Sequence, residues 1–111
     1  MLQVTRFKDA KGYDAKNHHG MTAMRLQGQG VTDLEDYWVG FSTFLPGGGA
    51  DTGAAPTGKT YVVLSGNLVV TTAEGDTELG PYDSCYLPPN TERSIENRTN
   101  LPVQMLVISP N

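Results

Sequence analysis

The stretch from Lys59 to Asn97 constrains the fold of this chain most strongly, because short β-rich runs alternate there with turn residues. Thr60–Leu64 and Leu68–Thr72 are rich in Val, Leu and Thr, which favour strands. Gly, Asn, Asp and Pro interrupt these runs at close intervals, as at Ser65-Gly66-Asn67. Such spacing is typical of an antiparallel β-sandwich or β-barrel. The sequence therefore predicts an all-β fold with little or no helix.

The rest of the chain extends this pattern to about nine short strands. Outside the central stretch, the predicted strands are an edge strand at Leu2–Phe7, then Met21–Gln27, Tyr37–Leu45 and Val103–Ser109. Bulky side chains alternate on both faces of Tyr37–Leu45, as in a strand covered on both sides. Pro46 and the three glycines after it should end that strand abruptly, and residues 50–58 should form a loop at the mouth of the barrel.

With 111 residues and no linker or repeat, the chain is expected to form one domain, residues 1–111. Residues 37–109 form its predicted barrel core. Residues 1–20 are mixed and polar, and we interpret them as an N-terminal arm that lies on the surface.

Composition excludes several classes of partner. The net charge is −4 and no basic block is present, so we expect no nucleic-acid binding. No apolar run is long enough to cross a membrane and no leader opens the chain, so we expect no membrane partner. The single cysteine, Cys85, excludes an intramolecular disulfide and suits a cytoplasmic location.

From Trp38 to Ser109 the chain resembles the cupins, a superfamily of small jelly-roll β-barrels with two sequence motifs. Gly47 and Gly66 occupy the first and last glycine positions of the first motif. Pro88 and Asn97 match the second motif, whereas Tyr82 and Asn90 stand at its glycine positions. This resemblance implies an antiparallel jelly-roll β-barrel that forms a single-domain cupin.

The resemblance also implies a metal centre with three histidines and one glutamate, and here the sequence departs from the family. The four ligand positions hold Gly53, Ala55, Lys59 and Arg93. Gly and Ala have no ligand atom in the side chain, and cationic side chains repel a divalent ion. We therefore predict no metal site and no cofactor, and the metal-dependent activities of the family are not expected.

If the barrel closes as in the family, Lys59 and Arg93 face the cavity where the metal would lie. Tyr61 and Val63 alternate with Lys59, and Ile95 alternates with Arg93, so they should face inward as well. Two cations and a phenol in an apolar wall would bind a small carboxylate or phosphate. The alternative is that the cations point outward or form ordinary ion pairs with acidic side chains, namely Glu92, Glu96 and Asp51.

His18 and His19, the only imidazoles, are the candidate general acid or base, together with Tyr61. The alternative is that both are solvated histidines of a loop. Tyr86 and Trp38 are further candidates for lining the ligand pocket, although each could simply pack in the barrel. Cys85 is interpreted as a core residue, since no histidine spacing suggests an activated thiol.

Three hypotheses for function follow. The first is a metal-independent cupin that binds a small organic anion and isomerises, decarboxylates or cleaves it by a lyase step. The second is a sensor or carrier with the same pocket and no turnover. The third is a metal enzyme with an unorthodox site at His18 and His19. We also expect a homodimer, because barrels of this kind pair through open sheet edges or terminal strands.

Overall fold

The computed structural model describes all 111 residues and is almost entirely β-structure. Its elements are η1 (Phe7–Asp9), β1 (Lys11–Gly12), β2 (His18–Gln27), β3 (Tyr37–Gly53), β4 (Lys59–Ser65), β5 (Leu68–Thr72), β6 (Gly75–Leu79), β7 (Ser84–Leu87), β8 (Arg93–Glu96) and β9 (Val103–Pro110). Every strand pairing is antiparallel. The prediction of an antiparallel all-β fold is confirmed.

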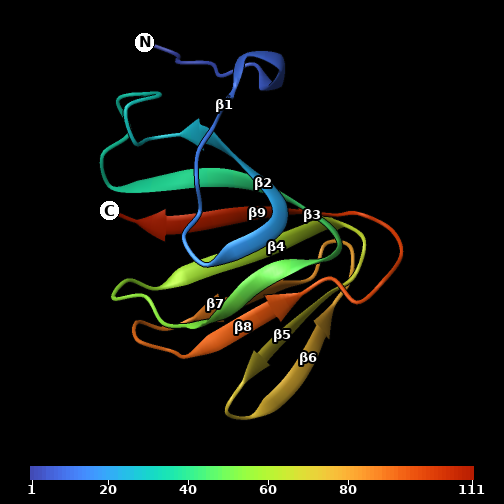
Figure 1. Cartoon of the computed structure of the whole chain (residues 1–111). Coiled ribbons are helices and arrows are strands. Elements are labelled where there is room, and N and C mark those ends of the chain that lie inside the picture. Colours follow the sequence, from blue (N-terminus) through green and yellow to red (C-terminus); the bar gives the residue numbers. More distant parts are fainter.

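The strands form a nearly closed barrel in the order β6-β5-β8-β3-β9-β4-β7, with β2 paired to β3 and β1 to β2 (Figure 1). β3 connects the two walls of the barrel. Its first part, from Tyr37 to Phe44, pairs with β9, and its second part pairs with β8 from Gly49 to Gly53. β2 accompanies β3 through both parts.

The glycine run is the main place where the expectation was wrong. β3 does not stop at Pro46 but continues to Gly53, so residues 50–53 of the predicted loop at residues 50–58 are strand. The glycines lie where β3 leaves β9 and joins β8. A Cβ atom at Gly48 would collide with the carbonyl of Gly20, and one at Gly49 with the carbonyl of Ile95. The glycines therefore allow close backbone contact at a corner of the barrel rather than ending the strand.

The N-terminal region also differs from the prediction. Leu2–Phe7 is not a strand; Phe7–Asp9 forms a short 3-10 helix, and β2 begins at His18 rather than Met21. The Phe7 ring lies edge-on against Phe41, with the ring centroids 5.0 Å apart, so it covers part of the outer face of β3, whereas Tyr37 on the same strand stays exposed. The arm continues into β1, which pairs antiparallel with β2 (Figure 1).

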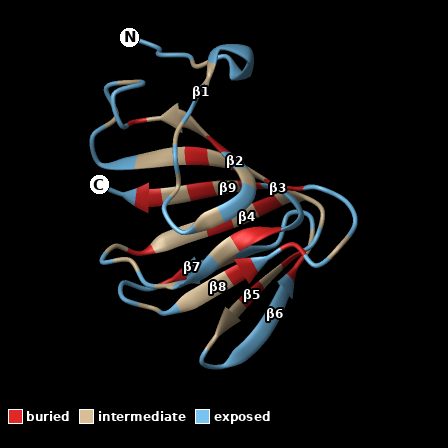
Figure 2. Ribbon diagram, in the orientation of Figure 1, coloured by how far each residue is buried: buried red, intermediate tan, exposed pale blue.

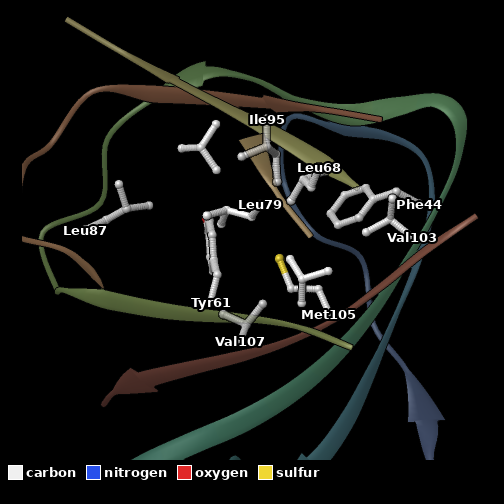
Figure 3. Close-up of a cluster of buried hydrophobic side chains, with 11 residues drawn as sticks. Phe44, Tyr61, Leu68, Leu79, Leu87, Ile95, Val103, Met105 and Val107 are labelled. Carbon is white, nitrogen blue, oxygen red and sulfur yellow. The ribbon is translucent and has the colours of Figure 1, made fainter. Parts of the chain in front are cut away.

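The core occupies the interior between the two walls, as the buried segments of the ribbon show (Figure 2). Period-two alternation of side chains explains which residues are buried. On β9, for example, Val103, Met105 and Val107 are buried while Gln104 is exposed. Side chains from β3, β4, β8 and β9 meet inside the barrel (Figure 3). Tyr61, Val63 and Ile95 are all buried, which confirms their predicted inward orientation.

Asn97, which matches the second cupin motif, has a structural role. Its side chain is fully buried and donates hydrogen bonds to the carbonyls of Phe44 and Leu101. Its Oδ1 atom accepts hydrogen bonds from the backbone N–H and hydroxyl of Thr99. Asn97 thereby holds the loop after β8 against β3. The one helix, η1, spans only three residues, so the structure contains no helix that could span a membrane.

Candidate functional site

A cavity of about 150 Å³ lies inside the barrel and combines charged, phenolic and apolar side chains. Eleven residues line it: Tyr13, Ala15, His18, Trp38, Ser42, Lys59, Tyr61, Arg93, Ile95, Met105 and Val107. Five of the seven residues that we predicted for the site are therefore together in one cavity, from segments far apart in the sequence. They are His18, Trp38, Lys59, Tyr61 and Arg93.

Strand alternation explains this convergence. Lys59 and Tyr61 are two residues apart on β4, and Arg93 and Ile95 are two apart on β8. Met105 and Val107 have the same relation on β9. Residues two apart on a strand face the same side of the sheet, so each strand contributes neighbouring side chains to the interior.

The guanidinium of Arg93 is held in place by two hydrogen bonds. Its Nη1 donates to the carbonyl oxygen of Gly53 at 3.1 Å, and its Nη2 donates to the hydroxyl oxygen of Tyr61 at 3.4 Å. Gly53 is the strand partner of Arg93, so the fold itself sets the first contact. The other N–H groups of the guanidinium remain free for a ligand.

Lys59 contacts neutral groups only. Its Nζ donates to the hydroxyl of buried Ser109 at 3.3 Å and lies 5.1 Å from the centre of the Trp38 ring. Burial lowers the pKa of the Lys59 ammonium from its ordinary value, and the positive charge of Arg93 lowers it further. A negative ligand between the two cations would counter both effects.

Tyr61 is kept in its protonated form. Burial raises the pKa of its phenol, although the charge of Arg93 and its hydrogen bond act in the opposite direction. Because Arg93 donates to the phenol oxygen, the hydroxyl hydrogen of Tyr61 is available to another acceptor. The Tyr61 hydroxyl is thus free to donate a hydrogen bond to a ligand in the cavity.

The arm supplies one side of the cavity through Tyr13, Ala15 and His18. The backbone N–H of Tyr13 bonds to the carbonyl of Ala23, and the Arg25 guanidinium lies 4.2 Å from the centre of the Tyr13 ring. Burial raises the pKa of the Tyr13 phenol, while the positive charge of Arg25 opposes this.

The tautomer of His18 follows from its hydrogen bond. Its Nδ1 lies 2.7 Å from the carbonyl oxygen of Lys16. Since a carbonyl oxygen only accepts, Nδ1 must carry the hydrogen, and in the neutral ring Nε2 has the free electron pair. The ring also stacks on Phe44, with centroids 6.5 Å apart. His18 therefore has the form required of a general base.

No carboxylate lines the cavity. The three acids considered as partners of the cations lie elsewhere: Asp51 faces His19, Glu96 pairs with Arg98, and Glu92 is exposed. Lys59 and Arg93 form no ion pair with any of them. The alternative of ordinary ion pairs is therefore wrong.

Two predicted site residues lie outside the cavity. His19 points away from His18 toward Asp51, with 3.7 Å between Nδ1 and Oδ1, and about half of its side chain is exposed. Tyr86 is 62% exposed and lines a separate groove between the β5–β6 hairpin and β7. Cys85 also lines that groove; burial raises the pKa of its thiol, as expected for a packing residue.

Sequence reasoning did not single out several residues at the cavity, among them the lining residue Tyr13 and Ser109, which holds Lys59. Ser109 receives the Lys59 hydrogen bond and shares its orientation with Val107 and Met105, so strand alternation was a signal for it. Tyr13 belongs to the arm, and no local pattern indicated that this tyrosine reaches the cavity.

The donor atoms in the cavity do not fit the metal centre of typical cupins. His18 is its only imidazole, and no three side chains of His, Cys, Asp or Glu come together anywhere in the structure. Gly53 contributes a carbonyl that is already bonded to Arg93. His18 and His19 diverge, so the hypothesis of an unorthodox metal site at this pair has no geometry behind it.

A wider groove of about 470 Å³ adjoins the cavity. It lies along the arm and β2, and it shares Tyr13, Ala15 and His18 with the cavity. Asp14 is its only acidic lining residue. The cavity and the groove are therefore neighbours that meet at these three shared residues.

Solved structures of other proteins have a similar fold. The structure is similar to the polyketide cyclase RemF from Streptomyces resistomycificus, with a TM-score of 0.88 and 15% identity over 99% of this chain and 80% of that one. It also resembles a sugar phosphate isomerase from Silicibacter pomeroyi, with a TM-score of 0.74 and 23% identity over 83% of this chain and 60% of that one. At these identities the likeness concerns the fold alone.

Sequence comparison gives a nearer relative. The chain is 42% identical over 106 residues to the Beta-D-galactosidase Rv1717 of Mycobacterium tuberculosis, and the match covers 96% of this chain and 91% of that protein. The model of the Cupin domain family matches residues 40–109. The chain therefore belongs to the cupin family.

Proposed function

We propose that this protein is a cupin enzyme that cleaves a galactoside in the barrel cavity and needs no metal ion to do so. The observation that carries the proposal is the convergence of His18, Tyr61, Lys59 and Arg93 in one cavity. The similarity to a β-D-galactosidase over nearly the full length of both chains supports the substrate class.

These residues provide acid–base chemistry. The free Nε2 of His18 can take a proton, and the phenol of Tyr61 can give one. Lys59 and Arg93 stabilise negative charge that develops on the substrate between them. Trp38 and Tyr13 add aromatic surface to the cavity wall, and a sugar ring can pack on the parts that Lys59 and Arg25 leave uncovered. Every step of this kind uses side chains of the chain itself, which is why we propose metal independence.

The test is release of galactose from a panel of β-galactosides, both neutral and carboxylated, by protein treated with EDTA. We expect release from at least one of them and no loss of rate after EDTA. His18→Gln should reduce the rate by about 100-fold or more, the scale of a lost general base. His19→Gln, at the neighbouring residue outside the cavity, should not. No galactose from any member of the panel would refute the proposal, and equal effects of the two histidine variants would refute the role of His18.

A second candidate is binding of a small organic carboxylate without turnover, as in a sensor or carrier. The specific observation in its favour is the pair of cations that have no acidic partner. Glucuronate or galacturonate should then raise the melting temperature, because a ligand that binds only the folded state stabilises it. Arg93→Ala should abolish most of this shift. Chloride at the same ionic strength is the control, and equal responses of wild type and Arg93→Ala would contradict an anion site.

A further inference from the structure

The positive charge of the cavity points to a more specific substrate. Lys59 and Arg93 are half-buried, and a neutral galactoside would cover them without supplying a counter-charge, which costs free energy because it removes water from both cations. Arg93 still has free N–H groups beside the two that bond to Gly53 and Tyr61. A carboxylate is the group that a guanidinium fork binds best, so the ring in the cavity should carry one.

The positive charge of the cavity also indicates which type of bond cleavage it can catalyse. Glycoside hydrolysis ordinarily uses two carboxyl groups and passes through a transition state that resembles an oxocarbenium ion. The cavity has no carboxyl group, and two cations would destabilise a positive transition state. Removal of a proton beside a carboxylate instead develops negative charge on that carboxylate, which Lys59 and Arg93 stabilise.

We propose that the substrate is a β-D-galactosyl-(1→4)-hexuronate and that the protein cleaves it by β-elimination. This inference rests on the proposed function and names its substrate class. The hexuronate ring occupies the cavity with its carboxylate at Lys59 and Arg93, and the galactose lies in the adjoining groove beyond His18. The cavity volume of about 150 Å³ is small for a ligand site. In this arrangement the cavity holds only one of the two sugar rings.

The step balances without water or a redox partner. His18 Nε2 takes the proton from C5 of the uronate, and the electron pair of that C–H bond forms the C4–C5 double bond. The bond from C4 to the glycosidic oxygen breaks, its electrons stay on that oxygen, and Tyr61 protonates it. The products are galactose and a 4,5-unsaturated uronate. Proton exchange with water then restores neutral His18 and the Tyr61 phenol.

The experiment compares two disaccharides that differ only at C6 of one ring, lactose and β-D-galactosyl-(1→4)-D-glucuronate. We expect the uronate to give galactose and a product with the ultraviolet absorbance of a conjugated carboxylate. The summed mass of the products should equal that of the disaccharide, with no added water. Lactose should remain intact. Tyr61→Phe should lower the rate by about 100-fold, the scale of a lost general acid, while Tyr37→Phe at a surface tyrosine serves as the matched control.

The outcomes separate this inference from the proposed function. Cleavage of lactose, or cleavage of the uronate with addition of water, would overturn the elimination and leave galactoside cleavage standing. If neither disaccharide nor any other galactoside is cleaved, both the elimination and the proposed galactoside cleavage are wrong. Unchanged elimination in Tyr61→Phe would remove Tyr61 as the acid.

Discussion

At the scale of single residues, neutral hydrogen-bonding groups hold the two charged side chains of the cavity in position. Arg93 is positioned by the carbonyl of Gly53 and the phenol of Tyr61, and Lys59 by the hydroxyl of Ser109. None of these contacts neutralises a charge. The two cations are therefore fixed in orientation yet still require a counter-charge, which is a suitable state for recognising an anion.

The raised pKa of Tyr61 predicts a pH dependence of stability. Because burial keeps this phenol protonated in the folded state, the folded protein binds more protons than the unfolded chain once the pH exceeds the ordinary pKa of about 10. The free energy of unfolding should then fall as the pH rises from about 10 through the raised pKa of the folded state. In Tyr61→Phe this part of the alkaline loss should disappear.

Urea unfolding at a series of pH values above 9 would measure this slope. Only the pH dependence of the unfolding free energy is compared, because Tyr61→Phe also removes the hydrogen bond from Arg93 and so lowers the absolute stability. Tyr37→Phe, measured in parallel, gives the effect of losing an exposed tyrosine hydroxyl, so any further change in Tyr61→Phe is due to burial of the phenol. An identical alkaline slope in Tyr61→Phe and wild type would contradict the argument.

At the scale of elements, β3 determines the shape of the barrel because it belongs to both walls. Its glycine corner brings β8, and with it Arg93, over the interior that β4 and β9 face from the other side. The same strand supplies Trp38, Ser42 and the carbonyl of Gly53. Any change that shifts the corner should therefore disturb both stability and the cavity.

Two glycines of β3 provide a matched test of this corner. A Cβ at Gly49 would collide with the backbone of β8, whereas one at Gly53 has only the carbonyl of Asp51 near it, at 3.9 Å. Neither residue has a positive φ, so the comparison isolates steric contact. Gly49→Ala should destabilise the protein by more than about 3 kcal/mol, and Gly53→Ala by less than about 1 kcal/mol. Urea denaturation measures both, and similar values for the two variants would show that close contact at Gly49 is unimportant.

At the scale of the whole molecule, the barrel retains unpaired edges at β6 and β7. The first residues of the chain also expose apolar side chains, among them Leu2, Val4 and Phe7. Open sheet edges and exposed apolar groups favour pairing with another copy. The homodimer expected from the sequence stays a prediction, and these edges and apolar side chains are where we propose that a second copy would pair.

Light scattering at micromolar concentration tests the homodimer. We expect a mass of twice the 12.0 kDa of one chain. A chain that begins after Phe7 should dimerise less if the exposed apolar arm contributes to the interface. A stable species of 12.0 kDa in the full-length protein would contradict the prediction.

The sequence by itself was sufficient for the class of fold and for most of the candidate site. Turn spacing is a local property and identified β4, β5 and β9, and side-chain alternation combined with the cupin resemblance gave the inward orientation of Tyr61, Val63 and Ile95. The cupin motif spacing then related Lys59 on β4 to Arg93 on β8, although more than thirty residues separate them. These predictions depend on strand period and motif register, which a sequence displays directly.

Tertiary structure decided what depends on contacts between distant segments. The local sequence of the glycine run predicts the end of a strand. Its close packing against Gly20 and Ile95 instead makes it part of a continuous strand. Likewise, the two adjacent histidines are equivalent in sequence. The course of the arm turns His18 toward the cavity and leaves His19 beside Asp51, because the position of an arm depends on the surface against which it packs and not on its own pattern.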